Sequence, residues 1–168
     1  MLNNIKDYLP LLNAVIITDL LFMIFIALNL INSKVLKEWY NKYTLSAVIA
    51  DVLIIMIVLL ITNKVYYYIF KEFSIINFII LALILQIIHD ILFYVLITII
   101  PIGKNRMIDT FKDYAKEVSF YAIIGDSLMI ISACLICYYL INMDINTNII
   151  ILIVSLYIMP YILYNNLF

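Results

Sequence analysis

The stretch FSIINFIILALILQIIHDILFYVLITIIP, residues 73–101, decides the fold of this chain. It is long enough to cross a hydrocarbon core of about 30 Å as a helix. In lipid every backbone N–H and C=O must be paired within the protein, so we expect a helix despite the many isoleucines. An ionised carboxylate at the centre of a bilayer costs about 2.5–3.5 kcal/mol or more. Something must therefore offset the cost of placing His89 and Asp90 in this stretch.

The whole chain has the composition of an integral membrane protein. Of its 168 residues, 67% are hydrophobic and 12% are charged, whereas soluble proteins are about half apolar and a quarter charged. The apolar runs predict an all-α, polytopic protein with five transmembrane helices, at about residues 8–32, 45–63, 74–101, 119–142 and 147–166. The first run is too long for a cleaved signal peptide. We expect a single membrane domain over residues 1–168, with the lipid bilayer as its partner and no nucleic-acid partner at a net charge of −1.

The basic residues predict an orientation. Seven of the ten Lys and Arg residues lie in the first and third connections, and three lie at the N-terminus and in the second connection. The positive-inside rule then places the N-terminus outside and the C-terminus in the cytoplasm. The aromatic stretch VYYYIF, residues 65–70, is expected at the membrane interface.

The third connection has its own periodicity. In NRMIDTFKDYAKEV, residues 105–118, apolar residues recur at helical spacing with charges on the opposite face. This predicts an amphipathic helix on the cytoplasmic surface. A helix that binds lipid or a partner and a plain solvated extension of the next span are both open. Near the other end of the chain, Pro160 lies inside the fifth span and should kink or shorten it.

Each of the first four spans contains one aspartate, and the surroundings of these aspartates recur. TDLLFMIF at Asp19 aligns with HDILFYVL at Asp90, and AVIADVLII at Asp51 aligns with AIIGDSLMI at Asp126. The separations, 90 − 19 = 71 and 126 − 51 = 75 residues, are nearly equal. We infer a 2+2 tandem repeat of about residues 5–70 and 74–142, with an extra helix at 147–166 and a pseudo-twofold axis along the membrane normal. Chance similarity among Ile-rich helices is the alternative.

The aspartates are expected to share one polar centre. Counted along the spans, all four fall near the midplane within about one turn, and facing lipid would be costly. Four neighbouring carboxylates cannot all be ionised, so bound protons or a cation must balance their charge. His89 is the chain's single histidine, and no Lys or Arg lies inside a span. The candidate site comprises the aspartates and the polar residues beside them or one turn away: Asp19, Asp51, Asp90, Asp126, His89, Gln86, Thr18 and Ser127.

This centre predicts transport. Intramembrane carboxylates in repeat-built bundles are typical of ion-coupled transporters, so we predict a transporter or channel-like protein for protons or small cations. A non-catalytic structural or assembly protein, in which the same groups join helices, is the alternative. We expect His89 to pair with an aspartate, although His plus carboxylates would also suit a divalent metal. No cofactor is predicted.

Two enzyme readings are disfavoured. Cys134 and Cys137 have the spacing of a redox pair, but they lie in an apolar helix, and the chain has no further cysteines to pass electrons on. The stretch IIGD at residues 123–126 is similar to the GxGD motif of intramembrane aspartyl proteases. It has Ile123 in place of the first glycine, and no partner YD motif accompanies it.

The stretches HDILFY, PIGKNRMIDTFKDYAKE and GDSLMI, within about residues 85–130, resemble small uncharacterised membrane proteins of large DNA viruses of algae and protists. The resemblance implies a viral setting, either the internal membrane of the virion or a host membrane. It implies no activity.

Overall fold

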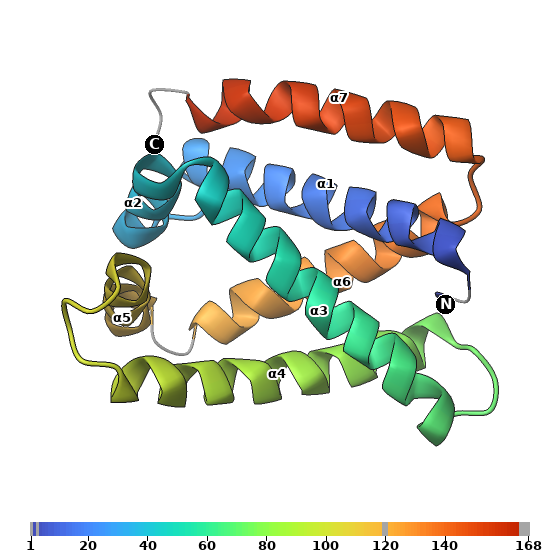
Figure 1. Ribbon diagram of the computed structural model, residues 1–168, viewed down its shortest axis with the longest axis horizontal. Coiled ribbons are helices and arrows are strands. Elements are labelled where there is room, and N and C mark those ends of the chain that lie inside the picture. Colours follow the sequence, from blue (N-terminus) through green and yellow to red (C-terminus); the bar gives the residue numbers. More distant parts are fainter. Residues whose placement is uncertain (1, 3, 119–120, 165–168) are drawn as a thin grey trace.

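The computed structural model describes residues 2, 4–118 and 121–164, and all regular elements in these ranges are helices (Figure 1). A short 3-10 helix, η1 (Ile5–Asp7), precedes seven α-helices. Five of these are long and apolar enough to cross a membrane. They are α1 (Tyr8–Ala27), α3 (Leu45–Ile69), α4 (Ile75–Ile99), α6 (Tyr121–Leu140) and α7 (Ile145–Leu163). Two shorter helices, α2 (Lys34–Tyr43) and α5 (Arg106–Val118), fill the first and third connections.

The five predicted spans are confirmed, with shifted ends. Helix α1 ends earlier than expected because Asn29 adopts a left-handed conformation (φ 58°) just after it. Helix α3 continues six residues past the predicted end at residue 63, to Ile69. Residues 119–120 and 165–166, at the predicted limits of the fourth and fifth spans, lie outside the described residues. Helix α7 continues through Pro160 to Leu163.

The amphipathic helix predicted in the third connection is present as α5, whereas α2 was not predicted. Tyr67 and Tyr68 are exposed, as an interface position requires, but Tyr66 is completely buried. Its ring packs against Phe78, and its hydroxyl contacts the backbone of Ser74. Tyr66 therefore belongs to the core at the turn between α3 and α4.

Four of the spans form a closed ring. In this ring α1 contacts α3, α3 contacts α4, α4 contacts α6, and α6 contacts α1. Helix α7 packs along α1, on the outer side of the ring (Figure 1). Its buried Asn148 meets the buried Asn13 of α1, whose Nδ2 donates to the Asn148 backbone oxygen at 2.8 Å.

The two short helices lie together at one end of the ring (Figure 1). They are antiparallel and fastened at both ends. Glu117, near the end of α5, accepts hydrogen bonds from the backbone N–H groups of Lys34 and Val35 at the start of α2, at 2.8 and 2.9 Å. At the other end Tyr43 donates to the backbone oxygen of Arg106 at 2.6 Å. The α2–α5 pair thus covers one end of the bundle.

A single residue joins α2 to α3. Thr44 has φ 46° and ψ −123°, a left-handed conformation that a β-branched residue rarely adopts. The chain therefore turns sharply between the two helices, and α2 folds back against α3 and α1. This turn brings the side chains of α2 toward the interior of the bundle.

Candidate functional site

The four aspartates lie in the half of the bundle next to α2 and α5. Each is on a different helix of the ring, between five and nine residues from the helix end nearest to that pair. At 1.5 Å per residue this is a depth of about 8–14 Å. The cluster therefore lies between the middle of the bundle and the end that carries α2 and α5.

A phenol from α2 joins two of the aspartates. The Oη of Tyr40 lies 2.9 Å from Asp19 Oδ1 and 3.0 Å from Asp51 Oδ2. The neighbouring Trp39 donates its indole N–H to Asp51 Oδ2 at 2.9 Å. Asp19 and Tyr40 are buried, and the second oxygen of Asp19 has no hydrogen-bond partner among the described residues. A helix outside the predicted spans therefore supplies the main partners of both carboxyl groups.

The hydrogens at this junction can be counted. A phenol has one hydrogen, so Tyr40 can donate to only one of the two carboxyl groups at a time. Both short contacts are full hydrogen bonds when the other carboxyl group carries a proton and donates it to Tyr40 Oη; when neither carboxyl group is protonated, the single phenol hydrogen is shared between the two oxygens. A proton carried by either aspartate is therefore within hydrogen-bond distance of Tyr40 Oη, which lies between the two carboxyl groups.

Helix α4 supplies a second group of polar side chains. Gln86 donates from Nε2 to Asp90 Oδ1 at 2.6 Å, and His89 Nδ1 lies 3.2 Å from the same oxygen. The other oxygens of this pair, Gln86 Oε1 and Asp90 Oδ2, are buried without a hydrogen-bond partner among the described residues. The His89–Asp90 contact has the pairing that the sequence predicted.

Tyr114 of α5 lies beside the remaining aspartate. Burial raises the pKa of its phenol, and the nearby carboxylates of Asp126, Asp51, Glu117 and Asp90 raise it further. Asp126 is itself close enough to Asp90 and Asp51 to interact with their charges. Burial likewise raises the pKa of Tyr40, with Asp19 and Asp51 adding to the effect. Each of the two short helices therefore places one tyrosine against the carboxyl cluster, the buried Tyr40 on α2 and the half-buried Tyr114 on α5.

The structure thus brings together most of the predicted polar residues, with two differences. The hydroxyl of Thr18 donates to the backbone oxygen of Ala14 on its own helix, at 2.8 Å, instead of to an aspartate. Ser127 is half-buried and makes no hydrogen bond with the described residues. Trp39 and Tyr40, which contact the aspartates, were not predicted from the sequence. Their signal was the aromatic and charged stretch KEWYNKY in the first connection.

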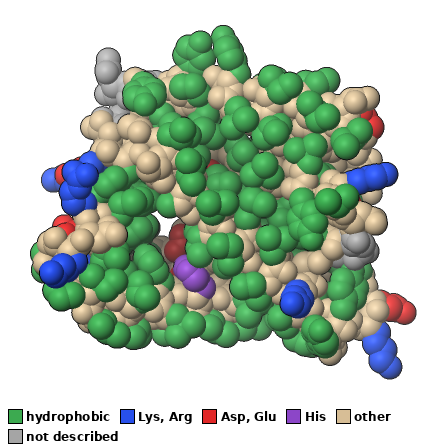
Figure 2. Space-filling model, viewed as in Figure 1, with side chains coloured by type: hydrophobic (Ala, Val, Ile, Leu, Met, Phe, Trp, Pro, Cys, Tyr) green, Lys and Arg blue, Asp and Glu red, His purple; other side chains and the backbone are tan. Residues whose placement is uncertain are grey.

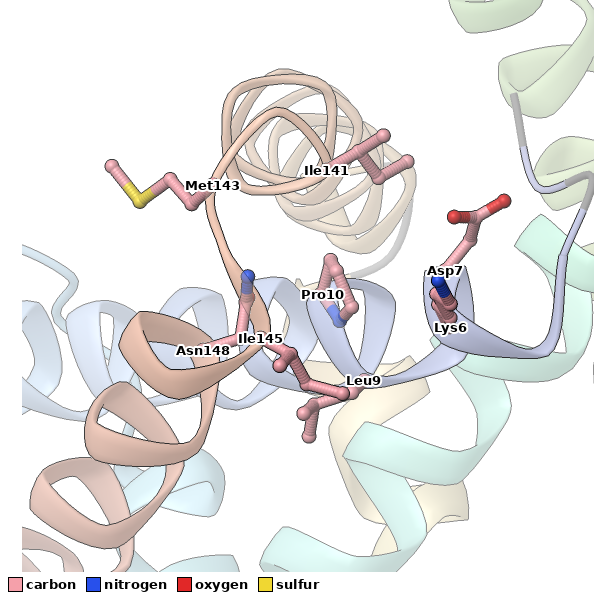
Figure 3. A pocket seen from close by; sticks show the side chains of 8 residues that line it. All are labelled: Lys6, Asp7, Leu9, Pro10, Ile141, Met143, Ile145 and Asn148. Carbon is pink, nitrogen blue, oxygen red and sulfur yellow. The ribbon is translucent and has the colours of Figure 1, made fainter.

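Two other places in the molecule are separate from this cluster. Cys134 and Cys137 are buried free thiols on α6. A cavity of about 130 Å³ opens at the end of the bundle where α1 begins (Figure 3). It is lined by Lys6, Asp7, Leu9, Pro10, Ile141, Met143, Ile145 and Asn148. Within residues 2, 4–118 and 121–164, no three His, Cys, Asp or Glu side chains are grouped so that they could hold a metal ion.

The fold and the site together define a class, a multi-pass helical membrane protein with carboxyl groups inside its bundle. Comparison with protein families, with curated proteins and with solved structures finds no match.

Proposed function

We propose that this protein transports protons or small cations, and that the Asp19–Tyr40–Asp51 junction is its proton-transfer element. The observation that carries the proposal is one phenol oxygen within 3.0 Å of two carboxyl groups. When the protonated aspartate gives its proton to Tyr40 Oη, Tyr40 gives its own proton to the other aspartate. One proton has then moved between the aspartates, and the tyrosine is neutral again.

The surroundings of the junction support this role. A carboxyl group inside a membrane is expensive, and groups kept at that expense commonly serve ion pathways. Asp126 is close enough to both Asp51 and Asp90 to interact with their charges. The carboxyl groups of Asp126 and Asp90 therefore continue the cluster from the Tyr40 junction to α4. There the half-buried His89 lies 3.2 Å from Asp90 Oδ1.

Flux measurements on reconstituted liposomes test the proposal. Wild-type protein should carry a proton current, reported by an enclosed pH-sensitive dye, when a potassium gradient and valinomycin set a membrane potential. Asp51→Asn and Tyr40→Phe should each reduce the flux at least tenfold. The matched control is Asp144→Asn, because Asp144 is exposed and caps α7, and asparagine caps helices equally well. Wild-type protein that is silent toward protons, Na⁺, K⁺ and divalent cations would contradict the proposal.

A structural or assembly protein is the second candidate. The observation that favours it is the number of contacts through which Tyr40, Trp39 and Glu117 join α2 to the rest of the bundle. Polar contacts of this kind hold helices together at about 0.6 kcal/mol each on average. Liposomes without flux, together with a loss of folding in Tyr40→Phe, would favour this candidate.

We further propose that the first four spans are a tandem repeat and that the α2–α5 end faces the cytoplasm. The ring of contacts is unchanged when α1 is exchanged with α4, α2 with α5, and α3 with α6, as a twofold repeat requires. The α2–α5 end carries the connections that contain seven of the ten basic residues. The resemblance to viral membrane proteins suggests a virion or host membrane as the site of action.

A further inference from the structure

The polar group on α4 is short of hydrogen-bond donors. Gln86 is only 5% exposed, and its Nε2 already donates to Asp90 Oδ1. Gln86 Oε1 and Asp90 Oδ2, the second oxygens of the two side chains that share this bond, are buried and have no partner among the described residues. Buried acceptors without donors are costly, and a carboxylate oxygen is the costliest. The site therefore has two unused acceptors, one of which is a carboxyl oxygen.

The missing donors do not come from the spans themselves. The backbone N–H groups of the helices are used within the helices. Lys64 is the one Lys or Arg in the helices α1, α3, α4, α6 and α7 as the structure describes them, and it lies toward the end of α3 that is far from α2 and α5. His89, the only histidine, already faces Asp90 Oδ1. A ligand from outside the bundle can supply what the protein lacks.

An opening leads to this site. The side chain of His89 is 31% exposed and that of Asp90 is 16% exposed. Figure 2 shows that this face of the molecule is hollowed where a histidine and acidic side chains meet, beside the end formed by α2 and α5. Asp90 lies nine residues from the end of α4, or about 14 Å along the helix. The opening thus lies on the side of the bundle, within reach of a lipid headgroup or a small molecule in the interface.

Aromatic rings continue from this opening to α2. His89 stacks on Phe93 with 5.9 Å between ring centres, and Phe93 meets the edge of Phe111 at 5.1 Å. Phe111 in turn contacts Trp39 at 4.6 Å. Aromatic faces attract organic cations, and the attraction grows when water is excluded. The row of rings connects the two acidic parts of the site, because Trp39 binds Asp51.

These features select a chemical class of ligand. Two free acceptors, of which one is a carboxyl oxygen, suit a cation that carries at least two N–H donors. A quaternary ammonium group has none, and a metal ion such as zinc or calcium needs four or more ligands. A primary ammonium group has three N–H donors and one carbon substituent, which can extend through the opening toward the lipid.

We propose that Gln86 and Asp90 bind a primary ammonium group, R–NH₃⁺, which enters through the opening beside His89. The inference rests on the proposed function in that the ammonium group would be the small cation that the cluster accepts. Binding itself requires no proton flux.

Binding to the full-length protein in detergent tests the inference, with octylammonium and octyltrimethylammonium as probes. Octylammonium should bind about tenfold or more tightly than its trimethyl counterpart, because only the primary amine can donate to both acceptors. Gln86→Leu and Asp90→Asn should each remove this preference, and Asp144→Asn should keep it. Equal affinity for the two probes, or a preference that survives Gln86→Leu, would overturn the inference.

The source of the ammonium group is determined in nanodiscs. If a lipid headgroup is the ligand, phosphatidylethanolamine added to the phosphatidylcholine disc that holds the protein should compete with octylammonium for the site. If the ligand is a free amine, ethylammonium in solution should compete with octylammonium for the protein in discs of phosphatidylcholine alone. If neither phosphatidylethanolamine nor ethylammonium competes with octylammonium, the inference is overturned. Amine binding by a protein without proton flux would contradict only the proton part of the proposed function, whereas flux without amine binding would contradict only this inference.

Discussion

Asn13 on α1 and Asn148 on α7 form a completely buried amide pair, in which Asn13 Nδ2 contacts both the backbone oxygen and Oδ1 of Asn148, at 2.8 and 3.2 Å. Asn148 also donates to the backbone oxygen of Leu140 at the end of α6. The fifth span, which carries no acidic residue, is therefore joined to the ring by hydrogen bonds as well as by apolar packing. The two residues lie far apart in the sequence, so nothing in either segment alone predicts the contact.

Replacing Asn13 by Leu should loosen α7 from α1. The change removes the donor to Oδ1 and to the backbone oxygen of Asn148. A double-mutant cycle with Asn148→Leu should give a coupling of about 0.6–1.7 kcal/mol. Unfolding in mixed detergent micelles gives the free energies of unfolding of wild type, the two single variants and the double variant. Asn146→Leu, on the exposed side of the same helix turn, is the control and should have little effect. Additive effects of Asn13→Leu and Asn148→Leu would contradict the coupling.

Glu117→Gln should loosen the start of α2. Glu117 accepts from the N–H groups of Lys34 and Val35, and a negative charge at a helix N-terminus is stabilising. Glutamine keeps the length of the side chain but removes the charge and one of the two acceptors, at a cost of about 0.5–1 kcal/mol. Hydrogen exchange at residues 34–36 should become faster.

Asp113→Asn is the control for Glu117→Gln. Asp113 also lies on α5, and its contact with Lys116 at 3.1 Å is exposed to solvent, where an ion pair contributes little. Exchange at residues 34–36 should not change in this variant. Equal exchange in Glu117→Gln and wild type would show that Glu117 does not hold α2.

The sequence predicts the spans of this protein better than it predicts the partners inside them. Long apolar runs require helices in lipid, so all five spans were found, and one aspartate in each of four spans pointed to a shared site. The partner of Asp19 was not predictable in this way, because Tyr40 reaches it only through the left-handed turn at Thr44. A β-branched residue gives no sequence signal for such a turn.

Alkaline pH should destabilise the protein through two phenols, those of the buried Tyr40 and the half-buried Tyr114. The pKa values of Tyr40 and Tyr114 are raised above the usual value of 10, chiefly by burial. A raised pKa means that the folded state holds the phenol proton more tightly than the unfolded state does. The stabilisation is therefore complete below about pH 10 and is lost as the pH rises from there toward the raised pKa values, by about 1.4 kcal/mol per pH unit for each phenol.

Unfolding free energies between pH 9 and pH 12 test this expectation. Tyr40→Phe and Tyr114→Phe should each be less stable than wild type at neutral pH but should lose less stability as the pH rises. Tyr68→Phe removes an 84% exposed phenol and serves as the control. If the unfolding free energies of Tyr40→Phe and Tyr114→Phe fall with pH as steeply as that of wild type, the phenols of Tyr40 and Tyr114 are not the groups that titrate.

The proposed repeat predicts a correspondence that was not used to find it. Tyr40 and Tyr114 are 114 − 40 = 74 residues apart, between the separations of 71 and 75 for the two aspartate pairs. A twofold repeat therefore places Tyr114 against Asp90 and Asp126 as Tyr40 is placed against Asp19 and Asp51. The carboxylates that raise the pKa of Tyr114 include both of these aspartates.

An experimental structure in a lipid nanodisc tests the repeat directly. A rotation of about 180° around the membrane normal should superpose residues 5–62 on residues 74–142. The same rotation should bring Tyr40 onto Tyr114, Asp19 onto Asp90 and Asp51 onto Asp126. Because equivalent positions should do equivalent work, Tyr114→Phe should reduce proton flux as Tyr40→Phe does, with Tyr68→Phe unaffected. The two halves are not equivalent if the axis lies in the membrane plane or if the helix pairs do not superpose. Full proton flux in Tyr114→Phe, together with no flux in Tyr40→Phe, would also refute their equivalence.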